Sequence, residues 1–427
     1  MLIAGEASGD TLAAELAGAL RDRCIEVDSA PTPDAQPLRT PLAPRFFGAG
    51  GPRMAAAGVE LAVDMTRHST IGIFDVLNQL FKFRQLFHQL LALAIERQPD
   101  AIIGVDYNWF NLHFAHVIRQ YLRQHSGAFH GWNPKIVKYV SPQVWASRPG
   151  RALRMAEDYD LLLSIFPFEK EWYARRAPKL RVEFVGHPLV ERFQNLAVER
   201  RKAEASAAPP NVLLLPGSRK GALYRHMPRM LKAARLISAV VAVRWGIVLP
   251  DERLAQDLAK CLILQYPELE TPLPAGSSPA PGWWLKTARM LAGKILPGVE
   301  IQIGNLPEAL AQAGLAIAST GTVTMECAYF GVPAVTLYKA SWRDYEIAKR
   351  IVKVKSLTMP NLIANEEVYP EFIQDAATPE NIARAALELL QNESRRREIK
   401  SRLEKVVASL GGPGASRRAA EAIVELL

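Results

Sequence analysis

The sequence has little cysteine and no long apolar run. Its three cysteines, Cys24, Cys261 and Cys327, are scattered over 427 residues. This set excludes a cysteine-based metal cluster and fits a reducing, cytoplasmic compartment. No run of about 18 apolar residues is free of charge, so we expect no membrane-spanning helix. The N-terminus lacks a basic segment followed by an apolar stretch, so we expect no export signal.

Several familiar motifs are also missing. The sequence contains neither a Gly-x-Ser-x-Gly elbow nor a His-Glu-x-x-His pair. It has no Walker loop, and Gly-x-Gly-x-x-Gly is absent from the first predicted βα turn, which argues against a dinucleotide oxidoreductase. The stretch FFGAGGPRM (46–54) is glycine-rich but follows the predicted second strand. Zinc-finger spacing and an RNA-binding aromatic signature are not evident, so we expect no nucleic acid partner.

What is present is the composition of a globular protein. Hydrophobic residues make up 49% and charged residues 22%, and the length allows two domains with full cores. Lys and Arg exceed Asp and Glu by 52 to 43, a formal net charge of +9. This excess favours an anionic partner, with a membrane surface or phosphorylated ligands ahead of nucleic acid.

Short apolar runs alternate with helical patterns along most of the chain. Such strands, apolar on both faces, predict a doubly wound parallel α/β fold. The runs are MLIA, AIIGVD, KIVKYVS, LLLSIF, VEFVG, NVLLLPGS, WGIVLP, GLAIAS and PAVTLY. A break at 196–210 gathers charge and small residues and ends in Pro-Pro, which indicates a linker. We therefore expect domains at 1–198 and 209–395, with helices at about 400–427 packing back on the first.

Three other stretches stand out. Residues 28–45 are proline-rich and predict a surface loop. Residues 267–298 look like an insertion. Its Trp283 and Trp284, beside basic residues, are typical of a membrane interface. The favoured interpretation is that this stretch forms a short helix packed on its own domain. Residues 71–98 form an aromatic, basic helical pattern whose Phe81, Lys82, Phe83 and Arg84 cannot all face one core, which leaves apolar surface for a lipid, a membrane or a subunit.

The opening MLIAGEASGD predicts a strand, a glycine-bracketed turn and an alanine-rich helix from Thr11 to Leu20. In parallel sheets this turn faces the ligand crevice. The alternative is that Gly5 and Gly9 serve turn geometry only, with Ser8 or Asp10 as helix caps.

Two stretches in the second half suit a nucleotide diphosphate. In LLLPGSRKG, Gly217 permits a tight turn whose N–H groups can meet an anion, and Arg219 adds a cation. In ASTGTVTMECA, Ser319 to Thr322 end a strand at a helix N-terminus, which suits a phosphate. Glu326, one turn further on, suits a ribose diol, although it can equally be a structural carboxylate.

Carboxylates follow strands in the first half. In IIGVDYNWFN, Asp106 ends an apolar strand, where it can accept a proton from an attacking hydroxyl or cap the next helix. Asp158 and Asp160 have the spacing of a metal-binding pair, but they lead directly into a buried strand. We read that spacing as chance and expect no metal.

Together these motifs resemble one family, the lipid-A-disaccharide synthases, which are inverting glycosyltransferases of the two-domain GT-B type. The matching pieces occur in family order over residues 1 to about 375. They are AGEASGD, GAGGPRM, GVDYNWFN, YVSPQVWASRPGR, FPFEKEWY, FVGHPL, LLPGSRKG, ASTGTVTMECA and MPNLIA. The resemblance implies two Rossmann-like domains facing a central cleft.

The resemblance also implies a reaction without a cofactor. The 6-hydroxyl of 2,3-diacylglucosamine 1-phosphate attacks UDP-2,3-diacylglucosamine, releases UDP and forms a β-1,6 disaccharide phosphate. The catalytic residues would be Asp106, as the general base, and Glu6, which with Ser8 would shape the facing acceptor side. UDP would be held by Gly217, Ser218, Arg219, Thr320, Gly321, Thr322, Glu326 and Asn361, and the acceptor and lipid side would include Ser8, Gly9, Arg53, Phe81, Trp145 and Arg148. The protein would be peripheral on the cytoplasmic face of the inner membrane, as a monomer or a homodimer.

The chain departs from the family pattern at three places. Trp109 stands where a second acidic residue is usual, Ser147 where tryptophan is frequent, and Gly221-Ala222-Leu223 where a glutamate is typical. These departures keep two alternatives in view. One is another GT-B enzyme of UDP-sugars, a muramyl-type transferase or an epimerase, and the other is a non-catalytic UDP- or lipid-binding relative.

Overall fold

The computed structural model describes residues 1–29, 44–65, 76–127, 131–194, 196, 210–269 and 282–427. The chain divides into two compact units, one formed by Met1–Glu191 with Leu410–Leu427 and the other by Arg192–Ser409. The last helix therefore belongs to the first unit, whereas the helix before it belongs to the second. The second unit also extends beyond the expected end at residue 395. Most of the expected linker at 196–210 lies outside the described residues.

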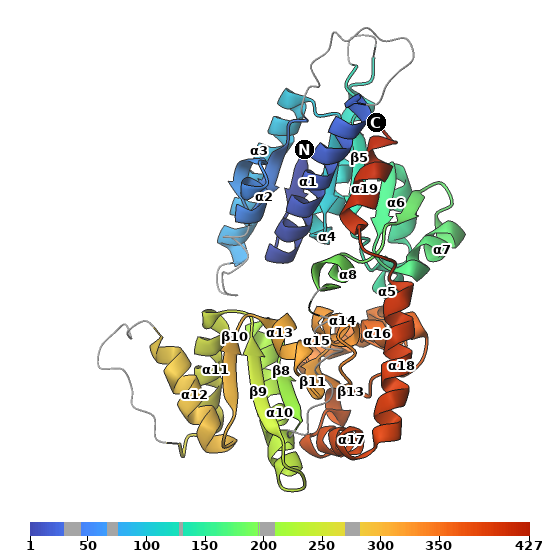
Figure 1. The fold of residues 1–427 in the computed structure, drawn as a ribbon. Coiled ribbons are helices and arrows are strands. Elements are labelled where there is room, and N and C mark those ends of the chain that lie inside the picture. The colour runs from blue at the N-terminus through green and yellow to red at the C-terminus, as the bar shows by residue number, and fades with distance from the viewer. Residues whose placement is uncertain (30–43, 66–75, 128–130, 195, 197–209, 270–281) are drawn as a thin grey trace. The chain divides into compact units, whose positions relative to one another are not determined.

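The first unit contains a seven-stranded parallel sheet in the order β3-β2-β1-β4-β5-β6-β7 (Figure 1). Its strands are β1 Leu2–Ala4, β2 Phe47–Gly50, β3 Glu60–Asp64, β4 Ala101–Val105, β5 Lys135–Tyr139, β6 Leu161–Ser164 and β7 Arg181–Phe184. Its helices are α1 Ala7–Ser29, α2 Pro52–Ala56, α3 Val76–Arg97, α4 Asn108–Gln124, α5 Val144–Ser147, α6 Arg151–Asp158, α7 Pro167–Arg176, α8 Leu189–Arg192, which ends at the unit boundary, and α19 Ala415–Val424.

The second unit contains a six-stranded parallel sheet in the order β10-β9-β8-β11-β12-β13. Its strands are β8 Asn211–Leu215, β9 Arg244–Leu249, β10 Glu300–Ile303, β11 Leu315–Ser319, β12 Ala334–Tyr338 and β13 Glu371–Ile373. Its helices are α10 Lys220–Ser238, α11 Glu252–Gln265, α12 Trp283–Ile295, α13 Leu306–Ala311, α14 Thr322–Tyr329, α15 Trp342–Ile351, α16 Met359–Ala364, α17 Pro379–Gln391 and α18 Glu393–Ser409, with a 3₁₀ turn at Gln374–Ala376.

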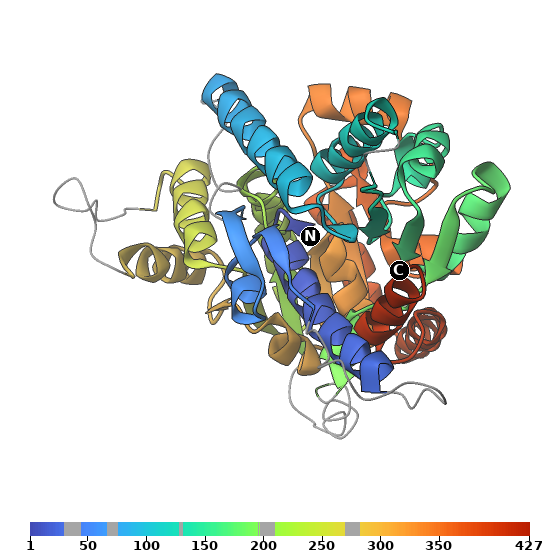
Figure 2. The same cartoon turned by 90° about the horizontal axis from the view of Figure 1, so that it is seen from above.

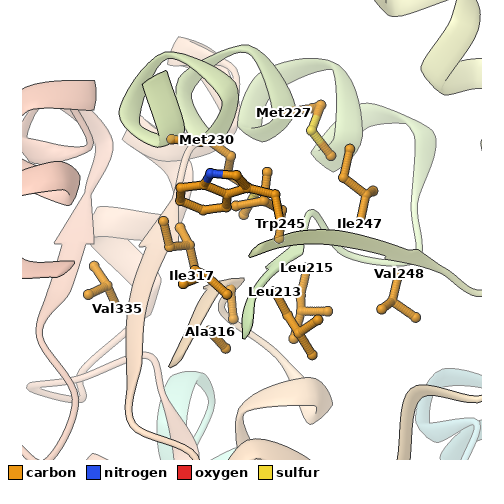
Figure 3. Packing of buried hydrophobic residues seen from close by; sticks show 14 of the residues in the cluster. Leu213, Leu215, Met227, Met230, Trp245, Ile247, Val248, Ala316, Ile317 and Val335 are labelled. Atoms are coloured by element: carbon orange, nitrogen blue, oxygen red, sulfur yellow. The ribbon is translucent and has the colours of Figure 1, made fainter. Parts of the chain in front are cut away.

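The apolar runs form strands because helices cover both faces of each sheet, so that side chains of either orientation are buried. In the second unit, Leu213 and Leu215 of β8 lie with Ala316 on one face of the sheet. Trp245, Ile247 and Ile317 lie on the other face, toward Met227 and Met230 of α10 (Figure 3). All nine predicted strands are present. The strands that the sequence analysis missed, β2, β3, β10 and β13, have short, polar or glycine-containing runs. The glycine-rich stretch at 46–54 itself contains β2 rather than following a strand.

Small residues bring the two ends of the first unit together. α1 and α19 pack side by side, as Figures 1 and 2 show, with Ala13, Ala17, Ala419 and Ala420 buried. The N–H of His187 donates to the carbonyl of Leu410 at 2.9 Å, which ties the returning chain to the end of β7.

Three predicted segments differ in their outcome. α1 is longer than expected and runs through Ser29; residues 30–43 of the predicted loop lie outside the described residues. Of the predicted insertion at 267–298, residues 282–298 are described. There α12 packs on α11 with Leu291 and Ile295 buried, as the interpretation of a helix packed on its own domain predicts. Among the described residues, no helix combines the length and apolar composition needed to cross a bilayer.

Candidate active site

A pocket of about 660 Å³ lies at the carboxyl ends of the strands of the second unit. The chain runs from β8 outward to β9 and β10 and then returns to β11 on the other side of β8. Ligands of open α/β sheets bind at such a switch point. The loops after β8 and β11 both line this pocket, together with residues after β9, β10 and β12.

The backbone around this pocket depends on two glycines. Gly217 has φ +100°, and a Cβ there would lie 3.1 Å from Ser319 Oγ, so the loops after β8 and β11 approach closely. Gly321, with φ 154° and ψ −162°, precedes α14 in a conformation open almost only to glycine. The N-termini of α10 and α14 adjoin these loops, where unpaired N–H groups and the helix dipole favour an anion.

Three cationic side chains line the pocket, those of Arg219, Arg225 and Lys339. Arg219 is exposed at the start of α10, and Arg225 lies on the pocket wall with its Nε donating to Lys339 O at 3.0 Å. Lys339 also lines the pocket and pairs with Asp375 Oδ1 at 3.1 Å. This arrangement is suited to a diphosphate.

Glu326 is the carboxyl group of this pocket. It lies on α14, and burial raises its pKa to about 7, partly offset by Arg192. A carboxylate here can accept two hydrogen bonds from a ribose diol. The pocket therefore brings together every predicted UDP-binding residue except one.

The exception is Asn361, which is buried and does not line the pocket. Its side-chain oxygen accepts from the N–H groups of Val368 and Tyr369 at 2.9 and 2.8 Å, and its Nδ2 donates to Tyr369 O. In this structure Asn361 holds a loop in shape.

Sequence reasoning missed His226, which is buried on the pocket wall. Its Nε2 accepts from the N–H of Lys339 at 3.0 Å, so Nδ1 carries the proton that is donated to Pro216 O at 3.1 Å. Burial lowers the pKa of His226, which agrees with a neutral ring joining the loops after β8 and β12. The sequence signal for it, which the sequence analysis did not use, is the spacing of Ala222, Arg225 and His226 on one helix face.

The departure at Gly221-Ala222-Leu223 also falls at this site. Gly221 and Ala222 line the pocket, and Leu223 is buried in the core. At these three positions, therefore, the chain supplies no carboxylate to the pocket, and Glu326 on α14 is the acidic residue that lines it.

The first unit repeats the same topology at β1 and β4, its own switch point. Glu6, Ser8 and Gly9 follow β1, and Asp106 follows β4. A Cβ on Gly9 would lie 3.7 Å from the Cβ of Asp106, so the two turns adjoin. Glu6 and Ser8 are exposed, and Asp106 is half-buried.

Asp106 lies in a strained turn. Asp106 and Tyr107 have φ values of 45° and 43°, in the left-handed region that ordinary residues rarely occupy. The carbonyl oxygen of Asp106 accepts from Asn111 Nδ2 at 2.9 Å and from Lys138 Nζ at 2.6 Å. These two donors fix the turn that carries the carboxyl group.

Lys138 is fully buried on β5, which sequence reasoning did not single out. Its Nζ lies near three main-chain carbonyls, those of Asp106, Tyr139 and Gly104. Burial lowers its pKa to about 7, and Asp106 opposes this shift.

The opening turn has a packing role as well. The ring of Tyr107 lies against Gly5, where a Cβ would be 2.2 Å from Tyr107 Cγ.

Asp10 does not cap α1, which begins at Ala7. Instead its carboxylate accepts from the N–H groups of Gly51, Arg53 and Met54 at 2.8 to 3.0 Å and caps α2. The side chain of Arg53 is exposed.

Trp145, predicted for the acceptor side, is buried. Its indole N–H donates to Glu169 Oε1 at 2.9 Å, and Glu169 Oε2 accepts from Ser164 at 2.8 Å. Burial raises the pKa of Glu169 to about 7 despite these bonds. The hydrogen bond from Trp145 to Glu169 thus connects the motif YVSPQVWASRPGR with the motif FPFEKEWY.

The other residues of the predicted acceptor side have mixed outcomes. Arg148 is exposed after α5, and Trp109, at the family's acidic position, is 64% exposed on α4. Ser147 is the last residue of α5. Phe81 lies in α3, but its side chain falls outside the described residues, whereas Phe83 lies 5.2 Å from the Trp109 ring centroid.

The carboxylates of the Asp158-x-Asp160 pair have separate partners. Asp158 lies 3.1 Å from His116 Nδ1, and Asp160 pairs with Arg119 and accepts from the N–H of Ile136. No group suited to a metal occurs in the described part of the chain.

Solved structures with a similar fold include glycosyltransferases and an epimerase. The chain resembles a putative UDP-N-acetylglucosamine 2-epimerase from Listeria monocytogenes, with a TM-score of 0.53 and 13% identity, over 100% of this chain and 95% of that one. The chain resembles the calicheamicin glycosyltransferase CalG4, with a TM-score of 0.54 and 14% identity, over 99% of this chain and 98% of that one. It also resembles the glycotransferase of kitacinnamycin, with a TM-score of 0.52 and 17% identity over 100% of both chains. Its two parallel α/β units have the GT-B fold.

Sequence relatives then define the family. The lipid-A-disaccharide synthetase family model matches residues 1–260 and 298–426. Lipid-A-disaccharide synthase of Azotobacter vinelandii is 34% identical over 100% of this chain and 97% of that protein, and that of Geobacter sulfurreducens is 31% identical over the same shares. The chain belongs to the lipid-A-disaccharide synthetase family. Residues 261–297, which the family model leaves unmatched, include most of the predicted insertion.

Proposed function

We propose that the chain transfers 2,3-diacylglucosamine from UDP to the 6-hydroxyl of 2,3-diacylglucosamine 1-phosphate, with inversion, to form a β-1,6 disaccharide phosphate in lipid A biosynthesis. One observation carries the proposal beyond family membership. It is the cationic pocket at the switch point of the second unit, with Arg219 and two helix N-termini for a diphosphate and Glu326 for a ribose.

In this mechanism the oxygen of the acceptor's 6-hydroxyl forms a bond to the anomeric carbon of the donor. The bond from that carbon to the β-phosphate oxygen breaks, and UDP leaves with the electron pair. Asp106 takes the hydroxyl proton as general base. Arg219 and the N–H groups after Gly217 and Gly321 stabilise the negative charge that develops on the diphosphate.

The acceptor and its acyl chains belong to the first unit in this proposal, with Ser8, Gly9, Arg53 and Arg148 near the sugar. Phe83 and the exposed Trp109 form an aromatic surface beside Asp106 that suits acyl chains. With the net charge of +9, this surface favours peripheral attachment to the anionic cytoplasmic face of the inner membrane.

The test is a mass-spectrometric assay of purified protein in mild detergent with both acylated sugars. We expect a disaccharide phosphate and UDP from the wild type and a rate at least about 100-fold lower from Asp106→Ala. Asp100→Ala, an exposed carboxylate before β4, is the matched control and should keep the wild-type rate. A folded wild type that binds UDP but releases neither product would overturn the proposal and favour a non-catalytic relative, and conversion of a UDP-sugar without an acceptor would favour an epimerase.

A further inference from the structure

A second, smaller cavity in the first unit lies one helical turn beyond Asp106. It has a volume of about 220 Å³ and lies between α4 and α6. Its walls are Trp109, Leu112, His113 and His116 from α4 and Arg151, Arg154, Met155 and Asp158 from α6. Trp109, on the wall of this cavity, comes three residues after the proposed base Asp106.

Among the described residues, the arginines of this cavity have no acidic partner. Arg151 and Arg154 are three residues apart and so share one face of α6, with Arg148 just before the helix. In the described part of the chain, no carboxylate lies within ion-pair distance of any of these three side chains. Arg119, Arg175 and Arg181 of the same unit, in contrast, each pair with an acidic residue.

The electrostatics of the cavity agree with this view. Burial lowers the pKa of Arg151, and repulsion from Arg148 and Arg154 lowers it further, which indicates that the guanidinium groups lie close together. The one carboxylate lining the cavity, Asp158, is almost fully buried and lies 3.1 Å from His116 Nδ1. Asp158 therefore has a hydrogen-bond partner within the unit, whereas Arg151 and Arg154 are both exposed.

We infer that Arg151 and Arg154 form a binding site for the phosphate monoester of the acceptor sugar, with Trp109 and Leu112 as its apolar wall. The inference rests on the proposed function, because that reaction requires an acceptor with a hydroxyl at one end of the sugar ring and a phosphate at the other. A hydroxyl at Asp106 places the rest of the ring beside the next turn of α4. Guanidinium groups bind phosphate through paired, charge-assisted hydrogen bonds.

The test compares two short-chain acceptors, 2,3-diacylglucosamine with and without the 1-phosphate, at saturating donor. Wild type should use the phosphorylated acceptor with a kcat/KM about 10- to 100-fold higher. The double variant Arg151→Ala, Arg154→Ala should lose most of this preference. Its rate with the unphosphorylated acceptor and its KM for the donor should stay within about twofold of wild type, which shows that the fold and the donor site are intact.

A matched control removes the same charge elsewhere. Arg175 and Lys179 are exposed in the first unit and lie outside both cavities, so Arg175→Ala, Lys179→Ala should retain the full preference. An undiminished preference in the Arg151, Arg154 variant would overturn the inference. Absence of product from wild type with either acceptor would instead overturn the proposed function.

Phosphate groups also occur in lipid headgroups, and a second measurement separates the two sources. Sedimentation with vesicles of phosphatidylglycerol and phosphatidylcholine should show equal binding for the double variant and its control. Loss of vesicle binding in the double variant alone, with the acceptor preference retained, would assign these arginines to the membrane surface and overturn the inference.

Discussion

The buried ammonium of Lys138 lies 2.6 Å from the carbonyl oxygen of Asp106. Because that carbonyl belongs to a residue with φ 45°, the lysine stabilises a backbone conformation that the chain would otherwise avoid. The proposed base is therefore positioned by a neighbouring strand as well as by its own.

Lys138→Met tests this relationship by keeping the side-chain length and removing the donor. Asn111 still holds the Asp106 carbonyl, so we expect a folded enzyme whose kcat falls about 10-fold, with little change in KM for either substrate. Steady-state kinetics measure this effect. An unchanged kcat would show that Asn111 alone fixes the turn.

The same variant has a signature in the pH dependence of stability. Burial lowers the pKa of Lys138 from 10.5 to about 7, so between these values the unfolded chain binds more protons than the folded one. The free energy of unfolding should then rise with pH across this window, by at most about 5 kcal/mol. Denaturant unfolding of wild type at pH 7 and pH 10 should show this rise, and Lys138→Met should lack it.

Glu169 is expected to show the opposite dependence. Burial raises its pKa from 4.5 to about 7, so the folded protein binds the extra proton in this window. Its contribution to the free energy of unfolding is fully present below pH 4.5 and decreases by about 3 kcal/mol as the pH rises to 7. Glu169→Gln keeps an acceptor for Trp145 and removes the titration, so the difference in Tm between the variant and wild type should shift in favour of the variant with rising pH. A pH-independent difference would contradict the assignment.

The sequence predicted the sheets and the second-unit pocket well, because apolar runs and glycine turns are local signals. The runs NVLLL and LAIAS predict buried strands, and Gly217 and Gly321 lie in the turns that lead from a strand to the next helix. Lys138, His226 and Asn361 were missed or misassigned because their roles depend on contacts between distant segments. A lysine in KIVKYVS reads as exposed until β4 and β5 pair and bury it, and Asn361 reads as a ligand until Val368 and Tyr369 fold back on it.

Glu326 predicts a pH dependence of nucleotide binding. With a pKa of about 7 in the free protein, it is partly protonated at neutral pH, whereas a ribose diol donates to the carboxylate form. Diol binding should therefore lower this pKa, and the affinity for UDP should increase as the pH rises from 6 to 8.

Calorimetry with UDP and 2′-deoxy-UDP separates this effect from titration of the nucleotide. The affinity advantage of UDP over its deoxy analogue should grow with pH in wild type and be small and constant in Glu326→Gln. If the advantage persists unchanged in the variant, Glu326 does not bind the ribose.

Two glycines near the N-terminus provide a closely matched pair of substitutions. A Cβ on Gly5 would lie 2.2 Å from the ring of Tyr107, so Gly5→Ala must displace that ring and disturb the turn that begins at Asp106. We expect a loss of about 1–3 kcal/mol in the free energy of unfolding, together with a reduced kcat.

Gly18→Ala is the control for the same change thirteen residues later. Gly18 lies within α1, where a Cβ would meet nothing within 4 Å, so alanine should stabilise the helix by up to about 1 kcal/mol and leave kcat unchanged. Thermal unfolding and the product assay measure both variants. Equal behaviour of the two would show that the contact with Tyr107 does not require glycine at position 5. Opposite shifts in Tm would establish that the first turn of the chain is shaped by the ring of Tyr107, the residue next to the proposed base.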